Sequence, residues 1–191
     1  MSARGPVRVA VLVSGGGTNL QALLDTLHDS PLARVTRVIS NRAGAGALDR
    51  ARRAGVATTV LKNPMDADEM LAALGDAQLV VLAGYLKLVP RPVVSRFRGR
   101  MINIHPALLP DFGGPGMYGH HVHHAVLASG ATESGATVHW VEGEFDRGEI
   151  IAQEKVPVSP TDTPDSLAAR VLEAEHRLLP RVVLDLARRM V

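Results

Sequence analysis

Short apolar segments alternate with segments of helical periodicity through the first half of the chain, and this alternation leaves few possible folds. Residues 7–13 read VRVAVLV, and residues 78–84 read QLVVLAG. Such β-branched runs are typical of parallel strands that are covered on both faces. In residues 18–28, four leucines recur with the spacing of one buried helix face. The alternation predicts an α/β fold in which a doubly wound, mostly parallel sheet carries helices on both faces.

The same patterns place the individual elements. The second half of the chain is less regular, and its two strands are candidates for antiparallel pairing. Thr163 is expected to cap the last helix, and Pro180 to kink or interrupt it. We predict strands at residues 7–13, 35–41, 57–62, 78–84, 101–105, 136–143 and 149–158, and helices at residues 18–28, 45–55, 66–75, 91–97, 120–129 and 163–189.

Composition excludes several classes of protein. With 191 residues, 46% of them hydrophobic, the chain suits one domain with a substantial core. Its 21 basic and 19 acidic residues are interspersed, without the basic stripe of a nucleic-acid-binding protein. There is no cysteine, so disulfides and thiolate metal sites are excluded. Because we find neither a membrane-length apolar run nor a signal peptide, we expect a cytoplasmic protein that binds neither nucleic acid nor membrane.

A glycine-rich loop, SGGGTN at residues 14–19, joins the first predicted strand to the first helix. Glycines let the backbone approach an anion closely, and the start of the following helix offers free N–H groups. Thr18 or Asn19 is expected to cap that helix. The loop therefore predicts a phosphate site, although a merely tight strand–helix turn remains the simpler alternative.

The loop does not match the common nucleotide-binding motifs. It lacks the Gly-Lys-Ser/Thr of a P-loop. A dinucleotide fingerprint requires a third glycine, where this chain has Leu20, and an acid after the second strand, where it has Arg42. Because Arg42 could face a 2′-phosphate, an NADP-dependent enzyme stays an alternative.

Two polar residues interrupt the apolar run INIHP at residues 102–106. Asn103 and His105 are two apart, so in a strand they point to the same face. Pro106 lacks an N–H and ends the strand, and ligands of open α/β sheets bind at such carboxyl ends. Asn103 can donate to a developing oxyanion, and His105 can transfer a proton at neutral pH. A hydrogen-bonded core histidine is the structural alternative.

A carboxylate beside His105 would set its tautomer and stabilise its charged form. Asp146, in the polar turn FDRGE, is the best candidate. From the sequence alone Glu142, Glu144 and Glu149 compete with it.

Glu175 falls on the apolar stripe of the last predicted helix, where an unpartnered glutamate is seldom found. It could pair with an arginine or bind an amine or hydroxyl group of a ligand.

Four histidines at positions 120, 121, 123 and 124 raise a metal-dependent hydrolase as a rival class of function. Residues four apart share a helix face, as metal ligands can. No cysteine and no second ligand set accompany them, so we expect no functional metal.

Six segments together resemble one known family. They are SGGGTNLQALLD, SNRAGAGALDRARRAG, VVLAGYLKLVP, MINIHPALLPDF, GATVHWV and FDRGEIIAQEKVPV. The match as a whole runs from about residue 7 to the final helix. The chain resembles the phosphoribosylglycinamide formyltransferases, folate-dependent enzymes of purine synthesis. The resemblance implies a single formyltransferase domain over residues 1–191, a Rossmann-like sheet and direct formyl transfer through a tetrahedral intermediate. 10-Formyltetrahydrofolate would be the cosubstrate, with no metal.

The resemblance also implies roles for particular positions. It implies a nucleotide-phosphate half at residues 7–100 and a catalytic and folate half at residues 101–191. The implied catalytic residues are Asn103, His105 and Asp146. The implied ribonucleotide contacts are Gly17, Thr18, Asn19, Gly84 and Glu175. The implied folate contacts are Leu86, Lys87, Leu88, Val89, Asn103, Glu142, Gly143, Glu144 and Phe145.

Related formyl-folate enzymes carry further domains. A methionyl-tRNA formyltransferase would add a C-terminal domain, and a formyltetrahydrofolate hydrolase an N-terminal one. Neither is expected within 191 residues. The expected partners are therefore the two small-molecule substrates, in a monomer or a homodimer.

Overall fold

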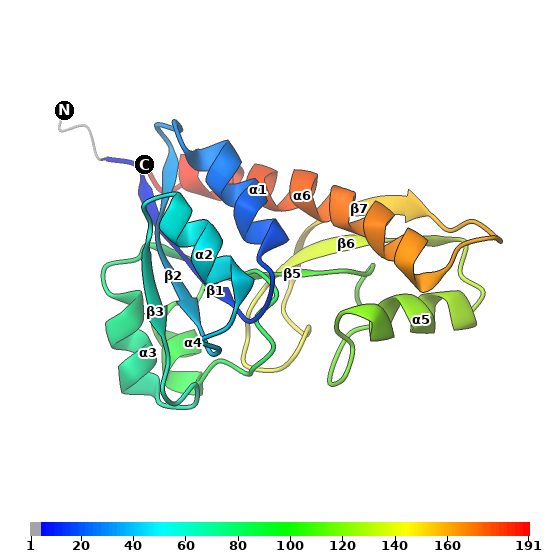
Figure 1. Ribbon diagram of the computed structural model, residues 1–191, viewed down its shortest axis with the longest axis horizontal. Helices are drawn as coiled ribbons and strands as arrows, with labels where there is room; N and C mark the ends of the chain where they lie inside the picture. The colour runs from blue at the N-terminus through cyan, green and yellow to red at the C-terminus, as the bar shows by residue number, and fades with distance from the viewer. Residues whose placement is uncertain (1–4) are drawn as a thin grey trace.

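The structure, a computed structural model, describes residues 5–191 and contains one seven-stranded sheet with the order β3-β2-β1-β4-β5-β6-β7 (Figure 1). The strands are β1 (Val7–Val13), β2 (Ala33–Ser40), β3 (Ala57–Val60), β4 (Leu79–Leu82), β5 (Met101–His105), β6 (Glu133–Trp140) and β7 (Ile150–Pro157). The helices are α1 (Thr18–Leu27), α2 (Gly46–Arg53), α3 (Ala67–Leu74), α4 (Arg91–Arg96), α5 (His120–Ala128) and α6 (Pro164–Arg188).

The sheet has a parallel part and an antiparallel edge. β3, β2, β1, β4 and β5 all run in the same direction, whereas β6 pairs antiparallel with β5, and β7 pairs antiparallel with β6. The predicted fold class is therefore confirmed, and the antiparallel strands lie at one edge. The carboxyl ends of β1, β4 and β5 meet at one end of the sheet, which is where ligands of such sheets bind.

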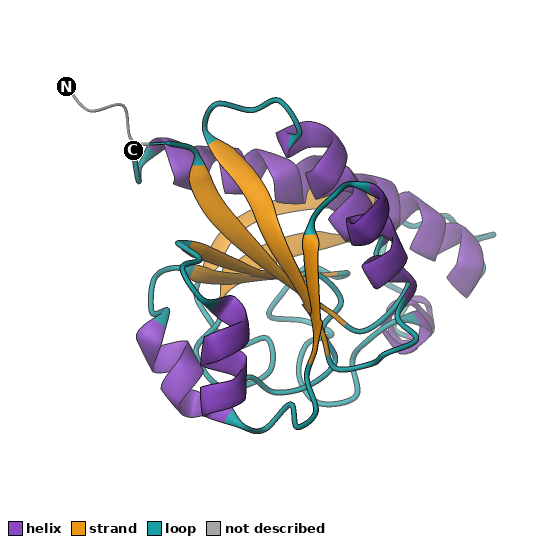
Figure 2. Cartoon of the chain, turned by 60° about the vertical axis from the view of Figure 1, so that its left-hand side comes forward, coloured by secondary structure: helices purple, strands orange, loops and turns teal. Residues whose placement is uncertain are grey.

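Helices cover both faces of the sheet, as Figure 2 shows. Alternate residues of β1 point to opposite faces, so Val9 and Val11 belong to one core cluster and Ala10 and Leu12 to the other. The first cluster includes buried residues of α1, α2, α5 and α6, and the second includes those of α3 and α4. This burial on both faces explains why β1 is apolar at almost every position.

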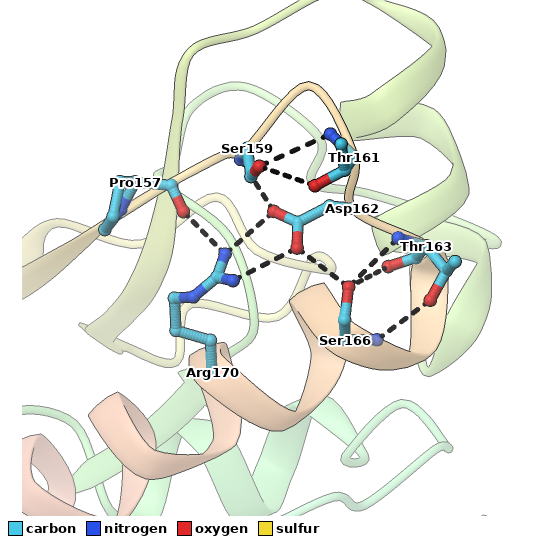
Figure 3. Close-up of polar contacts among 7 residues, drawn as sticks. All are labelled: Pro157, Ser159, Thr161, Asp162, Thr163, Ser166 and Arg170. Atoms are coloured by element: carbon cyan, nitrogen blue, oxygen red, sulfur yellow. Dashed lines mark hydrogen bonds and ion pairs between the residues drawn. The ribbon is translucent and has the colours of Figure 1, made fainter.

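The N-terminus of α6 is held by a dense polar network (Figure 3). Thr163 caps the helix as predicted, and it forms a capping box with Ser166. Asp162 accepts two hydrogen bonds from the guanidinium of Arg170, at 2.8 and 3.0 Å. It also accepts the N–H of Ser159, and these donors hold the pKa of Asp162 well below its usual value. The network fixes where α6 begins.

Pro180 lies inside α6, which is continuous from Pro164 to Arg188, so the interruption that the sequence allowed does not occur. A proline removes one helical N–H donor and disfavours an interior position. Here Leu178, Leu179, Val182 and Val183 are buried on either side of it. Their packing against the sheet favours a continuous helix over the local preference. α6 consequently extends along the length of the molecule (Figure 1).

Among residues 5–191, no helix is both long enough and apolar enough to cross a membrane.

Candidate active site

A cavity of about 440 Å³ opens at the carboxyl ends of β4 and β5. Residues of α6 and of the segment 114–119, which precedes α5, form other walls of this cavity. Gly17, Thr18 and Glu142 do not line it. The predicted site residues that do are Asn19, Gly84, Leu86, Lys87, Leu88, Val89, Asn103, His105, Gly143, Glu144, Phe145, Asp146 and Glu175. The structure therefore brings most of the predicted site into one space.

His105 is held between a carbonyl and a carboxylate. Its Nε2 lies 2.8 Å from the carbonyl oxygen of Phe112, which can only accept, so Nε2 carries the proton. Its Nδ1 lies 3.4 Å from Oδ1 of Asp146. The His105 and Asp146 side chains are 4% and 8% exposed, so their interaction is poorly screened by water. Among the acids of residues 5–191, Asp146 is the one within ion-pair distance of His105.

Asp146 is fixed by backbone and side-chain donors. Its Oδ2 accepts the N–H of Gly114 at 3.0 Å, and its Oδ1 accepts from Nδ2 of Asn103 at 3.3 Å. Its φ of 55° lies in the left-handed region, which costs a non-glycine residue about 1–2 kcal/mol. The turn thus holds the carboxylate in place against a local backbone preference.

A residue that the sequence did not single out, His139, completes the cluster. It lies directly opposite Asn103 in the antiparallel pair of β5 and β6. Its Nδ1 donates to the carbonyl oxygen of Trp140 at 2.8 Å, so its Nε2 can accept from Nδ2 of Asn103 at 3.0 Å. Thr137 and His139 are two residues apart, as Asn103 and His105 are, so each pair shares one face of its strand. This spacing was the available signal in the sequence. The register of β6 against β5 was needed to place His139 beside Asn103.

The protonation states of the buried pair follow from their surroundings. Burial lowers the pKa of His105, although Asp146 and the Phe112 carbonyl act in the opposite direction. Burial would raise the pKa of Asp146, but the imidazoles of His139 and His105 and the N–H of Gly114 lower it further. The ligand-free site therefore contains a neutral imidazole beside an ionised carboxylate, which is an arrangement suited to accepting a proton.

The start of α1, directly after the glycine loop, differs from the predicted one. Gly17, with φ 77°, is the N-cap, and no side chain caps the helix. The predicted cap by Thr18 or Asn19 is therefore wrong, because both residues already lie within the first turn. The N–H groups of Gly16, Gly17 and Thr18 donate to no protein atom in the described part of the chain, so they remain free for a ligand.

Ser14 connects the glycine loop to the opposite wall of the cavity. Its hydroxyl donates to Oδ1 of Asn41 at 2.6 Å and accepts the N–H of Leu86 at 2.9 Å. The side chain of Ser14 thus orders both the start of the glycine loop and the start of the predicted folate segment.

Glu175 is 7% exposed and lines the cavity from α6. Burial raises its pKa to about 7, while Asn19 acts in the opposite direction. No arginine within residues 5–191 forms an ion pair with it, so the arginine alternative is wrong.

The histidines of α5 do not converge. His120 and His123 line the cavity, whereas His121 and His124 are exposed. No group of three or more potential metal ligands occurs among residues 5–191. Burial and the neighbouring histidines lower the pKa of His123 to about 4, so it is neutral at pH 7.

The sheet, the strand-end cavity and the buried polar cluster are those of an α/β enzyme acting on small molecules. The model of the formyl transferase family matches residues 7–183, and the chain belongs to this family.

Within that family, several relatives are named phosphoribosylglycinamide formyltransferase. The chain is 40% identical to the phosphoribosylglycinamide formyltransferase of Haemophilus influenzae, over 92% of this chain and 85% of that protein. It is 42% identical to the chloroplastic phosphoribosylglycinamide formyltransferase of Arabidopsis thaliana, of which it spans 64%. It also spans 18% of the bovine trifunctional purine biosynthetic protein adenosine-3, at 42% identity.

Solved structures agree with these relatives. The phosphoribosylglycinamide formyltransferase of Anaplasma phagocytophilum has a TM-score of 0.89 at 38% identity, with 96% of this chain and 87% of that chain covered. The glycinamide ribonucleotide transformylase 1 of Symbiobacterium toebii has a TM-score of 0.87 at 41% identity, with coverage of 98% and 90%. A dinucleotide-dependent reductase, the NADP alternative, is therefore set aside.

Proposed function

We propose that the chain transfers the formyl group of 10-formyltetrahydrofolate to the amine of 5-phosphoribosylglycinamide in purine synthesis. The observation that carries the proposal is the buried cluster of Asn103, His105 and Asp146 in a cavity that lies beside a glycine loop with free N–H groups. The relatives named above support the choice of substrates.

In the proposed reaction, the amine attacks the formyl carbon and forms a tetrahedral intermediate. Asn103 donates to the formyl oxygen as negative charge develops on it. Without ligand, the amide of Asn103 donates to His139 and, at the longer distance of 3.3 Å, to Asp146. The formyl oxygen would replace the longer of these two contacts, while His139 keeps the amide oriented.

His105 accepts the proton that the attacking nitrogen loses. The ionised Asp146, 3.4 Å from Nδ1, stabilises the resulting imidazolium. The C–N bond to the folate then breaks, and the imidazolium of His105 returns its proton to the folate nitrogen as that nitrogen leaves. No covalent enzyme intermediate is needed, and the folate acts as a cosubstrate that carries the one-carbon unit.

The two substrates are proposed to contact different sets of residues, which correspond only in part to the two halves of the domain. Residues 7–100 supply the glycine loop for the ribonucleotide phosphate, and residues 101–191 supply the catalytic residues. The ribonucleotide contacts proposed are Gly17, Thr18, Asn19, Gly84 and Glu175, and the folate contacts are Leu86, Lys87, Leu88, Val89, Asn103, Glu142, Gly143, Glu144 and Phe145. Residues of both sets, among them Asn19 and Phe145, line one cavity, which supports the proposal that the two substrates meet there.

An assay of 10-formyltetrahydrofolate consumption, with and without the ribonucleotide, tests the proposal. Consumption that requires the ribonucleotide is expected. Consumption without it would indicate a hydrolase. The same assay in excess chelator tests the expected independence from metal: loss of activity that zinc restores would overturn it.

The remaining expectations are proposals as well. We propose a cytoplasmic monomer or homodimer that binds neither nucleic acid nor membrane, although two plant relatives are named chloroplastic. Light scattering of the purified protein measures the oligomeric state, and cell fractionation measures the location.

A further inference from the structure

Arg50, on α2, contacts the glycine loop from outside the cavity. Its Nε donates to the carbonyl oxygen of Gly16 at 2.7 Å, and its Nη1 donates to Oε1 of Gln21 on α1 at 3.3 Å. The guanidinium therefore joins the loop to the two helices that flank it. A hydrogen bond from a charged donor is about twice as strong as a neutral one.

The start of α2 makes a second contact with the same loop. The N–H of Ala47 donates to the carbonyl oxygen of Gly15 at 3.0 Å. The two backbones approach closely, because a Cβ on Gly17 would lie 2.5 Å from Cβ of Ala47. Two successive loop carbonyls, those of Gly15 and Gly16, are thus turned toward α2.

The direction of these carbonyls fixes the direction of two N–H groups. The peptide bonds on both sides of Gly16 are trans, and in a trans peptide the N–H points opposite to the C=O. The N–H groups of Gly16 and Gly17 must therefore point away from α2. Neither donates to a protein atom within residues 5–191. Successive free N–H groups of this kind form a concave anion-binding nest.

The charge of Arg50 is also not neutralised by an acid. Within residues 5–191, no carboxylate lies at ion-pair distance from its guanidinium. By contrast, Arg52 on the same helix pairs with Asp49 at 2.9 Å. An unneutralised cation directly behind the loop adds to the attraction for a phosphate on the other side.

We propose that Arg50 is a positioning residue for the phosphate of the ribonucleotide. It does not touch the phosphate, but its bond to Gly16 turns the loop peptides so that their N–H groups face the ligand before binding. The inference rests on the proposed function, because it takes the glycine loop as the phosphate site. Preorganised donors of this kind lower the cost of ordering the loop on binding.

The test compares two substrates that differ in the phosphate alone, 5-phosphoribosylglycinamide and its dephosphorylated analogue. Arg50→Ala is expected to reduce kcat/KM for the phosphorylated substrate by about 10-fold, the scale of one charge-assisted hydrogen bond, through KM. The value for the dephosphorylated analogue should be unchanged. Arg53→Ala removes the same charge from an exposed position of α2 and should leave both values unchanged.

Arg50→Lys separates positioning from charge. Lysine keeps the charge but lacks the planar fork that holds Gly16 and Gln21, so this variant should stay impaired. Full recovery in Arg50→Lys would show that charge alone acts, and the proposal would be wrong. An equal loss for both substrates in Arg50→Ala would instead indicate damage to the fold.

A binding measurement keeps this inference distinct from the proposed reaction. Calorimetric titration of the wild-type protein and of Arg50→Ala with inorganic phosphate needs no turnover. If the wild type consumes no formyl folate but binds phosphate more tightly than Arg50→Ala, the proposed reaction fails and the role of Arg50 stands. Equal phosphate affinity in the two proteins would overturn the role of Arg50, whatever the reaction.

Discussion

The proposed site has two ends, the glycine loop beside the cavity and the polar cluster inside it, and they are built in different ways. At the carboxyl end of β1, the glycine loop offers backbone N–H groups that are consecutive in sequence. At the end of β5, the cluster consists of side chains from positions as far apart as Asn103 and Asp146, and their spatial arrangement depends on the antiparallel register of β6. In the proposed function, the first end would hold the phosphate through backbone shape, and the second would transfer a proton through a buried histidine. Binding and chemistry should therefore respond to different substitutions.

The largest effect is expected at the buried end. His105→Ala removes the proton acceptor, so kcat should fall by about 10²-fold or more, the usual scale for an acid–base group. KM for the ribonucleotide should change little, because the glycine loop is untouched. Steady-state kinetics with both substrates measures the two quantities.

An exposed histidine provides the control for that substitution. His124→Ala, on α5, should leave kcat unchanged. A near-normal kcat in His105→Ala would remove His105 from the mechanism, and a loss confined to KM would erase the contrast between the two ends.

The next effect concerns Glu175, which lines the cavity from α6. Its pKa rises from 4.5 to about 7 on folding, so the folded protein binds its proton more tightly than the unfolded chain does. The stability from this proton is fully present below about pH 4.5 and is lost as the pH rises toward 7. Because one pKa unit corresponds to about 1.4 kcal/mol, this rise in pKa amounts to a loss of about 3 kcal/mol in the free energy of unfolding.

Glu175→Gln removes this ionisation and keeps a similar shape. The free energy of unfolding of the variant, relative to the wild type, should therefore increase between pH 4.5 and 8. Urea unfolding across that range measures it, with the exposed Glu173→Gln on the same helix as control. A pH-independent difference would mean that folding does not shift the pKa of Glu175.

Local patterns were sufficient for most of the fold. β1 and α1 were predicted from residues that are neighbours in the chain, because the period of the apolar residues reports which faces are buried. The interruption predicted at Pro180 does not occur, for the converse reason. Its effect on α6 depends on packing against the sheet, which a local rule does not contain.

The same distinction, between local patterns and contacts across the fold, applies to the candidate site. The sequence pointed to Asn103 and His105 because the pair shares a strand, and to the glycine loop because it is contiguous. It left Asp146 among four acids and missed His139, since both depend on contacts across β5 and β6. Arg50 was also missed, because its contact with Gly16 spans 34 positions.

His139 offers a test of how the buried end is ordered. His139→Leu fills the space but cannot accept from Asn103, so the amide loses its orientation. We expect kcat to fall by about 10-fold, the scale of one buried hydrogen bond, with both KM values unchanged. Measured kinetics of His139→Gln, whose side-chain oxygen can accept, should show partial recovery. An effect on KM alone, or no recovery, would count against an orienting role.

The smallest effect is expected at the N-terminus of α6, a helix that forms a wall of the cavity through Ala168, Leu172 and Glu175. Thr163→Ala removes the capping side chain, which typically costs about 1 kcal/mol. For a domain of this size, that lowers Tm by about 2–4 °C. Calorimetry measures the shift, and Thr161→Ala, in the same loop but outside the helix cap, is the control.

Because the Asp162–Arg170 pair still anchors the helix, kcat and both KM values of Thr163→Ala should stay within twofold of the wild type, by the usual independence of distant sites. A change in one KM without a change in Tm would show that the start of α6 positions one substrate, and the division into a backbone end and a side-chain end would then be incomplete.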